Sequence, residues 1–244
     1  GWLRALAKPL EDERAGAATA YRWYLPDPPD FWSLVRSVWN APIAGLFGPG
    51  DSPFAWGGAM AIRKNAFVET GVREFWKNSV SDDYGLTKAV RKAGLRIAFA
   101  PGAMVASRDH TGGAEFFRWA LRQMVISRLY GAPLWWKALI GHLLYCAAMA
   151  ACAVEILAGS GAAEWALLAL LSPGLLKAAN RATLAKAQFP EHAEWFRRYG
   201  WVHTWWTPFT TWIWLGVLVA SAFTSTIEWR GYRYRLSRRS IIGR

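Results

Sequence analysis

The sequence contains little cysteine and begins without a recognisable leader. Its two cysteines, Cys146 and Cys152, lie six positions apart in one apolar run. On a helix this spacing does not bring them face to face, so we expect packed or lipid-facing thiols and neither a disulfide nor a metal pair. The first residues also lack the cationic, apolar and small-residue pattern of a secretory signal peptide, so none is predicted.

Acidic residues are scarce relative to basic ones. The chain has 29 Lys and Arg against 17 Asp and Glu, which gives a formal net charge of +12. Such an excess indicates an anionic partner, which could be nucleic acid, a membrane surface or an anionic substrate. The basic residues cluster beside apolar and Trp-rich segments, which favours the membrane surface. No known nucleic-acid-binding pattern appears, so no nucleic acid is expected.

Apolar residues make up 53% of the chain and gather after about residue 134. Residues 138–157 have about the length of one bilayer crossing. Residues 162–176 are interrupted at 172–174 by Ser-Pro-Gly, which predicts a kinked span or a re-entrant segment. Residues 201–223 are apolar with tryptophans in their first half, as in an interfacial anchor, and the basic, amphipathic residues 180–199 suit the headgroup surface. We expect two crossings and one shallow element, with all soluble parts cytoplasmic.

The residues before this apolar region alternate between helical and extended patterns, which predicts an α/β domain. Asp30 is a candidate cap for the second helix, and Gly71 and Gly94 are candidate helix stops. A loop rich in glycine and proline covers residues 41–56. The predicted helices cover residues 2–10, 31–40, 65–71, 84–93 and 114–130, and the predicted strands lie at 17–24, within 56–64, at 95–100 and at 104–107.

Two adjacent carboxylates, Asp82 and Asp83, precede the helix at 84–93. Ser81 or Asp82 is expected to be its N-cap, so one carboxylate has a purely structural explanation. Two exceed what a cap needs, and a glycine-rich loop before them with a strand after them is typical of a base at the carboxyl edge of an α/β sheet. We therefore predict a catalytic role for this pair, in which the charge of one carboxylate raises a pKa of the pair.

Two further groups of residues are candidates for substrate binding. Gly57 and Gly58 would let the backbone approach a ligand closely, although a tight turn without a ligand explains them as well. The helix at 114–130 is cationic and aromatic, which suits a phosphate-bearing leaving group. We predict that it faces the acidic pair across a cleft, with candidate residues Arg118, Trp119, Arg122 and Gln123. A lone loop histidine, His110, could ligate a metal or bind phosphate, but such a residue more often does neither.

Three motifs together resemble the membrane-bound family 2 glycosyltransferases of the ceramide glucosyltransferase type. They are G-G-A-M-A-I-R-K, S-D-D-Y-G-L-T-K-A-V-R-K-A-G and the terminal I-E-W-R-G-Y-R-Y-R-L, with an Arg-bearing helix and apolar segments between the second and third. The resemblance implies a GT-A type α/β fold followed by membrane helices. It also implies inverting transfer of a sugar, such as glucose, from a UDP-sugar to a lipid hydroxyl such as that of ceramide.

The resemblance also implies roles for the candidate residues. Asp83 takes the position of the general base, with Asp82 where Glu is more usual. The family motif Gln/Arg-x-x-Arg-Trp is imperfect here, because Gln123 stands where Trp is usual, while a literal Arg-Trp occurs one turn earlier at 118–119. We favour Arg122 for the diphosphate and Trp119 as a stacking surface, and the register of the motif and the donor and acceptor preferences stay open.

In the family, the nucleotide and a divalent cation, Mg or Mn, bind through strands and an Asp-x-Asp motif that precede a Trp-Leu-containing helix. Here that helix is residues 2–8, and this sequence contains no Asp-x-Asp. We therefore expect a C-terminal fragment that is inactive alone, in a bacterial inner membrane or its equivalent. Its expected parts are the end of the cytoplasmic catalytic domain at 1–132, transmembrane or interfacial helices at 133–226, and a basic cytoplasmic strand and tail at 227–244.

Two other functions compete with this interpretation. A membrane-anchored structural protein that only binds anionic lipid would leave Asp82 and Asp83 exposed at a helix start with no cavity nearby. A processive polysaccharide synthase would need a continuous channel of several spans, and the short, interrupted segments argue against it.

Overall fold

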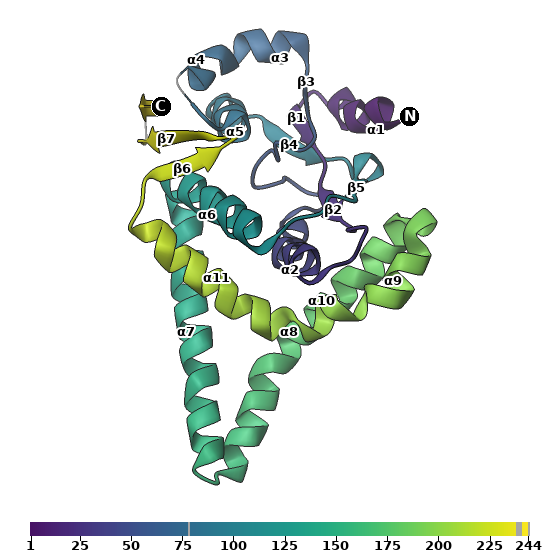
Figure 1. The fold of residues 1–244 in the computed structure, drawn as a ribbon. Coiled ribbons are helices and arrows are strands. Elements are labelled where there is room, and N and C mark those ends of the chain that lie inside the picture. The colour runs from purple at the N-terminus through teal and green to yellow at the C-terminus, as the bar shows by residue number, and fades with distance from the viewer. Residues whose placement is uncertain (78, 238–240, 244) are drawn as a thin grey trace. The chain divides into compact units, whose positions relative to one another are not determined.

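The structure is a computed structural model that describes residues 1–77, 79–237 and 241–243. Figure 1 shows the elements of a mixed α/β chain that is mostly helical. The contacts divide it into two compact units, which are described one at a time. Unit 1 comprises residues 1–24, 43–108 and 225–244, and unit 2 comprises residues 25–42 and 109–224. The functional division into three parts predicted above stays a prediction.

The main sheet of unit 1 is built around β1 (Ala15–Thr19). β1 pairs antiparallel with β3 (Met60–Ile62) and parallel with β4 (Arg96–Phe99). All its residues are buried, and their small side chains allow other elements to pack closely on both faces. A Cβ on Gly16 would lie 2.9 Å from a methyl of Val90, so glycine lets α5 (Asp82–Lys92) approach β1.

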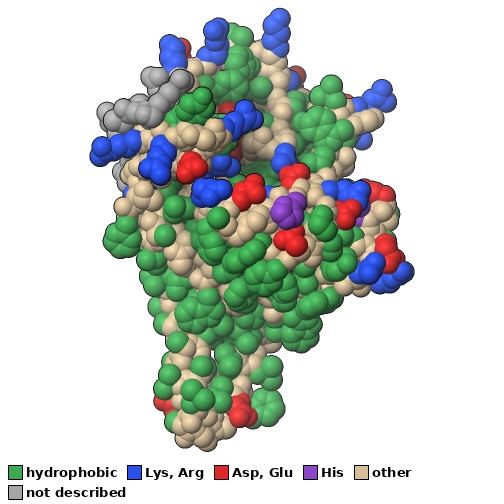
Figure 2. Space-filling view, in the orientation of Figure 1, with side chains coloured by type: hydrophobic (Ala, Val, Ile, Leu, Met, Phe, Trp, Pro, Cys, Tyr) green, Lys and Arg blue, Asp and Glu red, His purple; other side chains and the backbone are tan. Residues whose placement is uncertain are grey.

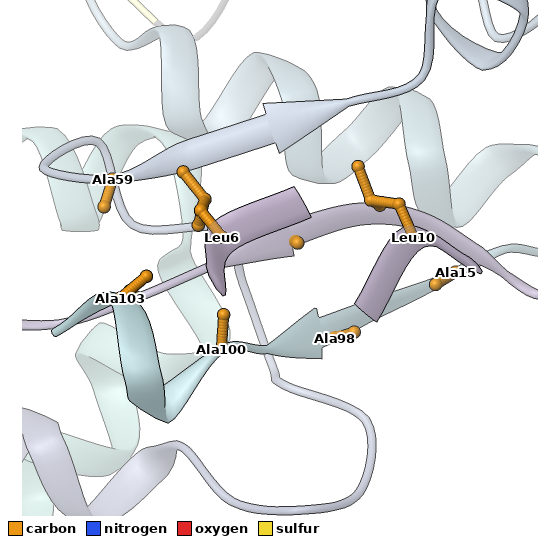
Figure 3. Packing of buried hydrophobic residues seen from close by; sticks show 9 residues of the cluster. Leu6, Leu10, Ala15, Ala59, Ala98, Ala100 and Ala103 are labelled. Carbon is orange, nitrogen blue, oxygen red and sulfur yellow. The ribbon is translucent and has the colours of Figure 1, made fainter. Parts of the chain in front are cut away.

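Two small cores lie against β1 because successive strand residues point to opposite faces. On one face, Leu86, Ala89 and Val90 of α5 pack in a cluster with Ala17 and Ile97. In the second core, Leu6 of α1 (Trp2–Ala7) and Leu10 of the 3₁₀ helix Lys8–Glu11 pack on alanines, as Figure 3 shows. These alanines are Ala15, Ala18, Ala20, Ala59, Ala98, Ala100 and Ala103.

The single strand predicted at residues 17–24 is wrong, because the chain changes partners within it. β1 ends at Thr19, and β2 (Arg22–Tyr24) pairs in parallel with β5 (Val105–Ser107) in a separate sheet. At the break, the Ala20 N–H donates to the Ala59 carbonyl over 3.0 Å, and the Tyr21 carbonyl accepts from Val105 N–H over 3.2 Å. The short connecting helices are α3 (Lys64–Glu69), α4 (Val72–Trp76) and the 3₁₀ helices Ala41–Leu46 and Pro101–Ala103.

The C-terminal residues form a third sheet in unit 1. β6 (Thr226–Trp229), β7 (Tyr232–Leu236) and β8 (Ile241–Gly243) pair antiparallel in that order. The basic strand expected at the start of 227–244 is therefore a hairpin with a third strand added. Residues 238–240 and 244 of the predicted tail lie outside the described residues.

Unit 2 is helical, with an aromatic core. α2 (Phe31–Asn40) is capped as predicted, since the Asp30 side chain accepts from the Ser33 N–H over 3.2 Å. The fully buried Trp39 stacks on Trp214 of α11 (Thr207–Ala222) with ring centroids 4.0 Å apart. This core also contains residues of α6 (Gly113–Tyr130) and of α7 (Ala132–Leu157), namely Phe116, Ala120, Met124, Trp135 and Leu139.

The second apolar segment is longer than predicted. α8 (Gly161–Gln188) is one helix of 28 residues that continues through Pro173, so the re-entrant alternative for residues 162–176 is not supported. The Ser172 hydroxyl donates to the Ala169 carbonyl over 3.3 Å, a contact typical of apolar helices that tolerate proline. The third apolar stretch, predicted at 201–223, is divided into two helices, α10 (Trp201–Trp205) and α11. The 3₁₀ helix Pro190–His192 and α9 (Ala193–Tyr199) precede them in the chain.

Among the described residues, two helices are long and apolar enough to cross a membrane, namely α7 and α8. They pack as a helical hairpin, and Figure 2 shows many hydrophobic side chains along the lower projection, with acidic side chains only near its tip. Only 11% of the most apolar window of each helix is buried, whereas the core helix of a soluble protein would be mostly buried. This supports membrane association, and the side on which each end lies stays a prediction.

Candidate functional site

The acidic pair lies in the first turn of α5. Ser81 is the N-cap, because its hydroxyl oxygen accepts from the Tyr84 N–H over 3.3 Å. Asp82 and Asp83 follow it, where the helix dipole favours negative charge. The helix ends before Gly94, whose φ of +72° is the left-handed conformation predicted for a helix stop.

Asp83 is held by three hydrogen bonds. Its Oδ1 accepts from the Tyr84 N–H over 2.8 Å and from the Ser81 hydroxyl. Its Oδ2 accepts from the Gly57 N–H over 3.3 Å. Asp83 is half-buried, whereas Asp82 is exposed. The two carboxylates therefore have different environments, and Asp83 is the more restrained of the pair.

Burial raises the pKa of Asp83 above its usual value. The neighbouring Asp82 charge acts in the same direction, and hydrogen bonds from Ser81, Tyr84 and Gly57 oppose it. This agrees with the expectation that one pKa of the pair is raised. A carboxylate with a raised pKa is a stronger base once it is ionised, as general base catalysis requires.

Gly57 and Gly58 both lie where a side chain would be crowded. A Cβ on Gly57 would lie 3.2 Å from Oδ2 of Asp83, and a Cβ on Gly58 would lie 2.1 Å from the Trp56 ring. The expected close approach of the backbone is thus observed, with protein groups as the partners. Contact of these glycines with a ligand stays a prediction.

Two threonines that the sequence analysis missed attach the glycine loop to its surroundings. The Thr19 hydroxyl accepts from the Trp56 N–H over 2.8 Å. The Thr87 hydroxyl accepts from the Ala55 N–H over 3.0 Å and donates to the Asp83 carbonyl over 2.7 Å. Thr87 could have been found as the residue one helical turn after Asp83, whereas nothing local to Thr19 indicates its role.

The four candidate residues of the cationic helix lie on α6 in unit 2. Arg118 is exposed, and Trp119, Arg122 and Gln123 are half-buried. The Trp119 ring packs edge-on against Trp39 with centroids 5.2 Å apart, so it belongs to the aromatic core of that unit. Trp119 and Arg122 are three positions apart and share one face of the helix. Asp83 belongs to the other unit, and the cleft predicted between them stays a prediction.

Neither His110 nor the acidic pair provides a metal site. His110 Nε2 lies 3.4 Å from Oδ2 of Asp30, which gives this histidine a partner at the cap of α2. In the described part of the chain, no three His, Cys, Asp or Glu residues gather as a metal site would require. Both oxygens of Asp83 already accept hydrogen bonds. The described residues therefore do not fit a divalent cation. That the intact enzyme uses such a cation stays a prediction.

A hollow of about 530 Å³ lies elsewhere in unit 1. Its lining comes from α1, the following 3₁₀ helix and the region of β4, and includes Lys8, Asp12 and Arg96. None of the predicted site residues lines it. We therefore do not assign it to the acidic pair.

Comparison with known proteins identifies the family. The family model described as glycosyl transferase family 21 matches residues 43–242, a span that includes the glycine loop, the acidic pair and α6. A search of curated proteins finds no match to the chain. This match supports the ceramide glucosyltransferase type that the sequence motifs indicated. The family number is 21, whereas the sequence motifs had led us to expect family 2. The chain belongs to glycosyl transferase family 21, the ceramide glucosyltransferase family.

Proposed function

We propose that the protein is an inverting hexosyltransferase that moves glucose from a UDP-sugar to a lipid hydroxyl such as that of ceramide. Family membership supports glycosyl transfer over the structural alternative. The sugar, the donor, the acceptor and the cytoplasmic location of the reaction are parts of the proposal. The observation that carries it is the half-buried Asp83, which is held in place at a helix start and has a raised pKa.

In the proposed reaction, Asp83 accepts the proton of the acceptor hydroxyl. The hydroxyl oxygen attacks the anomeric carbon, the bond from that carbon to the diphosphate oxygen breaks, and UDP leaves with its electron pair. A carboxylate oxygen has about two lone-pair sites, and Oδ2 uses one for the Gly57 N–H. Oδ1 already accepts from both Ser81 and Tyr84. Oδ2 is therefore the atom that we propose as the base.

Residues of unit 2 have a supporting role in the proposal. A guanidinium group can stabilise the charge that develops on the departing diphosphate, which is the role proposed for Arg122. Trp119 would stack on the substrate while its ring keeps its T-shaped contact with Trp39. Arg118 is the alternative to Arg122 if the motif lies one turn earlier, and Gln123 takes the usual Trp position in the favoured register. The apolar surfaces of α7 and α8 would admit the acceptor's hydrocarbon tail from the bilayer.

No step of this mechanism passes through a metal ion, because the described residues do not fit one. The divalent cation and the donor nucleotide would need an Asp-x-Asp motif, which the sequence lacks. We therefore also propose that residues 1–244 expressed alone do not transfer sugar. The processive synthase alternative gains no support, since two candidate spans are found in the described residues.

The test is a transfer assay on the product of the complete reading frame, reconstituted in lipid nanodiscs. UDP-glucose and ceramide are supplied, and the product is analysed by NMR. We expect a single β-linked glucosyl lipid, because inversion of the α-linked donor gives the β configuration. An α-linked product would contradict the inverting mechanism, and transfer to water alone would contradict the lipid acceptor.

A further inference from the structure

The C-terminal hairpin separates its aromatic and basic side chains onto two faces. In the register of β6 and β7, Trp229 pairs with Tyr232 and Ile227 pairs with Tyr234. Because strand residues alternate between faces, these four residues share one face. The opposite face has Glu228 paired with Arg233 and Thr226 paired with Arg235.

Both faces are accessible near the tip of the hairpin. Tyr232 is 63% exposed and Trp229 is 40% exposed. Arg230, Arg233 and Arg235 are all exposed, and Glu228 is the single acidic residue of 226–236. The Arg230 guanidinium lies 5.7 Å from the centroid of the Trp229 ring. The tip therefore presents aromatic rings beside a net positive charge.

The hairpin is tethered next to the start of a candidate membrane span. In unit 2, the Trp135 indole N–H in the first turn of α7 donates to the Ser221 hydroxyl in the last turn of α11, over 3.0 Å. The Thr224 carbonyl accepts from Arg128 near the end of α6 over 2.7 Å. β6 begins two residues later, and two residues span at most about 7 Å. The covalent link thus keeps the root of the hairpin close to Thr224, which lies beside the start of α7.

We propose that the hairpin of β6 and β7 binds anionic phospholipid headgroups at the boundary where α7 enters the bilayer. Trp and Tyr are enriched at that boundary, and arginines near an anionic leaflet are attracted to its phosphates. Trp229 and Tyr232 would lie at headgroup depth, with Arg230, Arg233 and Arg235 binding lipid phosphates. The proposal rests on membrane insertion of α7 and does not depend on sugar transfer.

The turn of the hairpin allows the charge to be removed without loss of the fold. Arg230 and Gly231 have φ values of +52° and +80°, as in a two-residue type I′ turn. Asn-Gly is the preferred sequence for this turn, and Asn tolerates the left-handed conformation better than Arg does. Arg230→Asn should therefore keep or stabilise the turn while it removes the guanidinium.

The test uses the full chain in nanodiscs of neutral phosphatidylcholine, or in nanodiscs that also contain the anionic lipid phosphatidylglycerol. Cys146 and Cys152 are replaced by Ala, and a nitroxide spin label is attached at Tyr232→Cys. The depth of the label in the membrane is obtained from its accessibility to oxygen and to a water-soluble paramagnetic relaxation agent. The hairpin variant combines Arg230→Asn, Arg233→Gln and Arg235→Gln. The control variant removes three exposed cations of α3, α4 and α5 through Lys64→Gln, Arg73→Gln and Lys92→Gln.

We expect the label to lie at headgroup depth in the anionic discs and to move into water in the hairpin variant but not in the control. The ratio of membrane-bound to free hairpin should fall about fivefold for each arginine lost, and added salt should also lower it. A label in water in both lipids would overturn the proposal, as would an equal response of the hairpin and control variants. Thermal unfolding of each variant confirms that it is folded.

Discussion

The backbone N–H of Gly57 donates to Oδ2 of Asp83 over 3.3 Å. This bond joins a loop and a helix start that are 26 positions apart in the sequence. It orients one carboxylate oxygen, and a Cβ at residue 57 would crowd that oxygen at 3.2 Å, so a side chain there would displace it by a few tenths of an ångström. The proposed base and the glycine loop therefore form one structural element of unit 1.

A first prediction concerns this contact. Gly57→Ala should lower kcat about tenfold, because Oδ2 must shift by a few tenths of an ångström and small misplacements of a reacting group are costly. Gly48→Ala is the matched control, since a Cβ there meets nothing within 4 Å. Steady-state kinetics of the two variants check this. Equal activity of both would show that the position of Oδ2 is not critical.

A second prediction concerns Ser81, whose hydroxyl both caps α5 and donates to Asp83. Ser81→Ala should lower stability by about 1 kcal/mol through loss of the cap. It should also raise the pKa of Asp83 further, because this hydrogen bond lowers that pKa. The acid limb of the kcat/KM profile should then move to higher pH, and Ser81→Thr should restore it. A loss of stability with an unmoved acid limb would leave Ser81 with the capping role alone.

A third prediction follows from the raised pKa of Asp83. In the unfolded chain this carboxyl titrates near its ordinary value of about 3.9, so between that pH and the raised folded pKa the folded state binds more protons. The stability of the wild type should therefore fall across this window as pH rises, relative to Asp83→Asn. Thermal unfolding of both proteins over a series of pH values measures the difference. A difference that is independent of pH would show that the pKa of Asp83 is not raised.

A fourth prediction tests membrane insertion of α7. Leu144 lies near the middle of this helix and is 67% exposed. Leu144→Arg should cost about 3–4 kcal/mol of insertion free energy, since it adds the arginine penalty and loses the favourable leucine contribution, and it should reduce the carbonate-resistant membrane fraction. Leu3→Arg in α1 is the control, because Leu3 is 68% exposed and lies in unit 1. Equal membrane fractions for both variants would contradict a spanning α7.

The individual caps and stops were well predicted from the sequence because capping depends on residues only a few positions apart, whereas the predicted end of α8 was wrong. Asp30 and Ser81 are N-caps as expected, and Gly71 and Gly94 have the left-handed φ of helix stops. The strand predicted at 17–24 failed because its division is set by partners at Ala59 and Val105. Such distant pairings leave no local signal in the alanine-rich strand.

The same distinction applies to the candidate site. Asp82 and Asp83 could be identified because two adjacent carboxylates exceed what a cap requires. The glycine loop could be expected to approach something closely, but its partner became clear only from the Asp83 contact. Thr19 was missed because it supports Trp56 from 37 positions away. Trp119 was predicted as a stacking surface, and its packing on Trp39 depends on two separate helices.

The most direct test of the account is Asp83→Asn in the product of the complete reading frame. The amide cannot accept the acceptor's proton, so transfer should fall by about 10²–10⁴-fold while the affinity for UDP stays nearly unchanged. Glu69→Gln, which neutralises an exposed carboxylate on α3, should retain full activity. An Asp83→Asn protein that transfers sugar at the wild-type rate would contradict the assignment of Asp83 as the base.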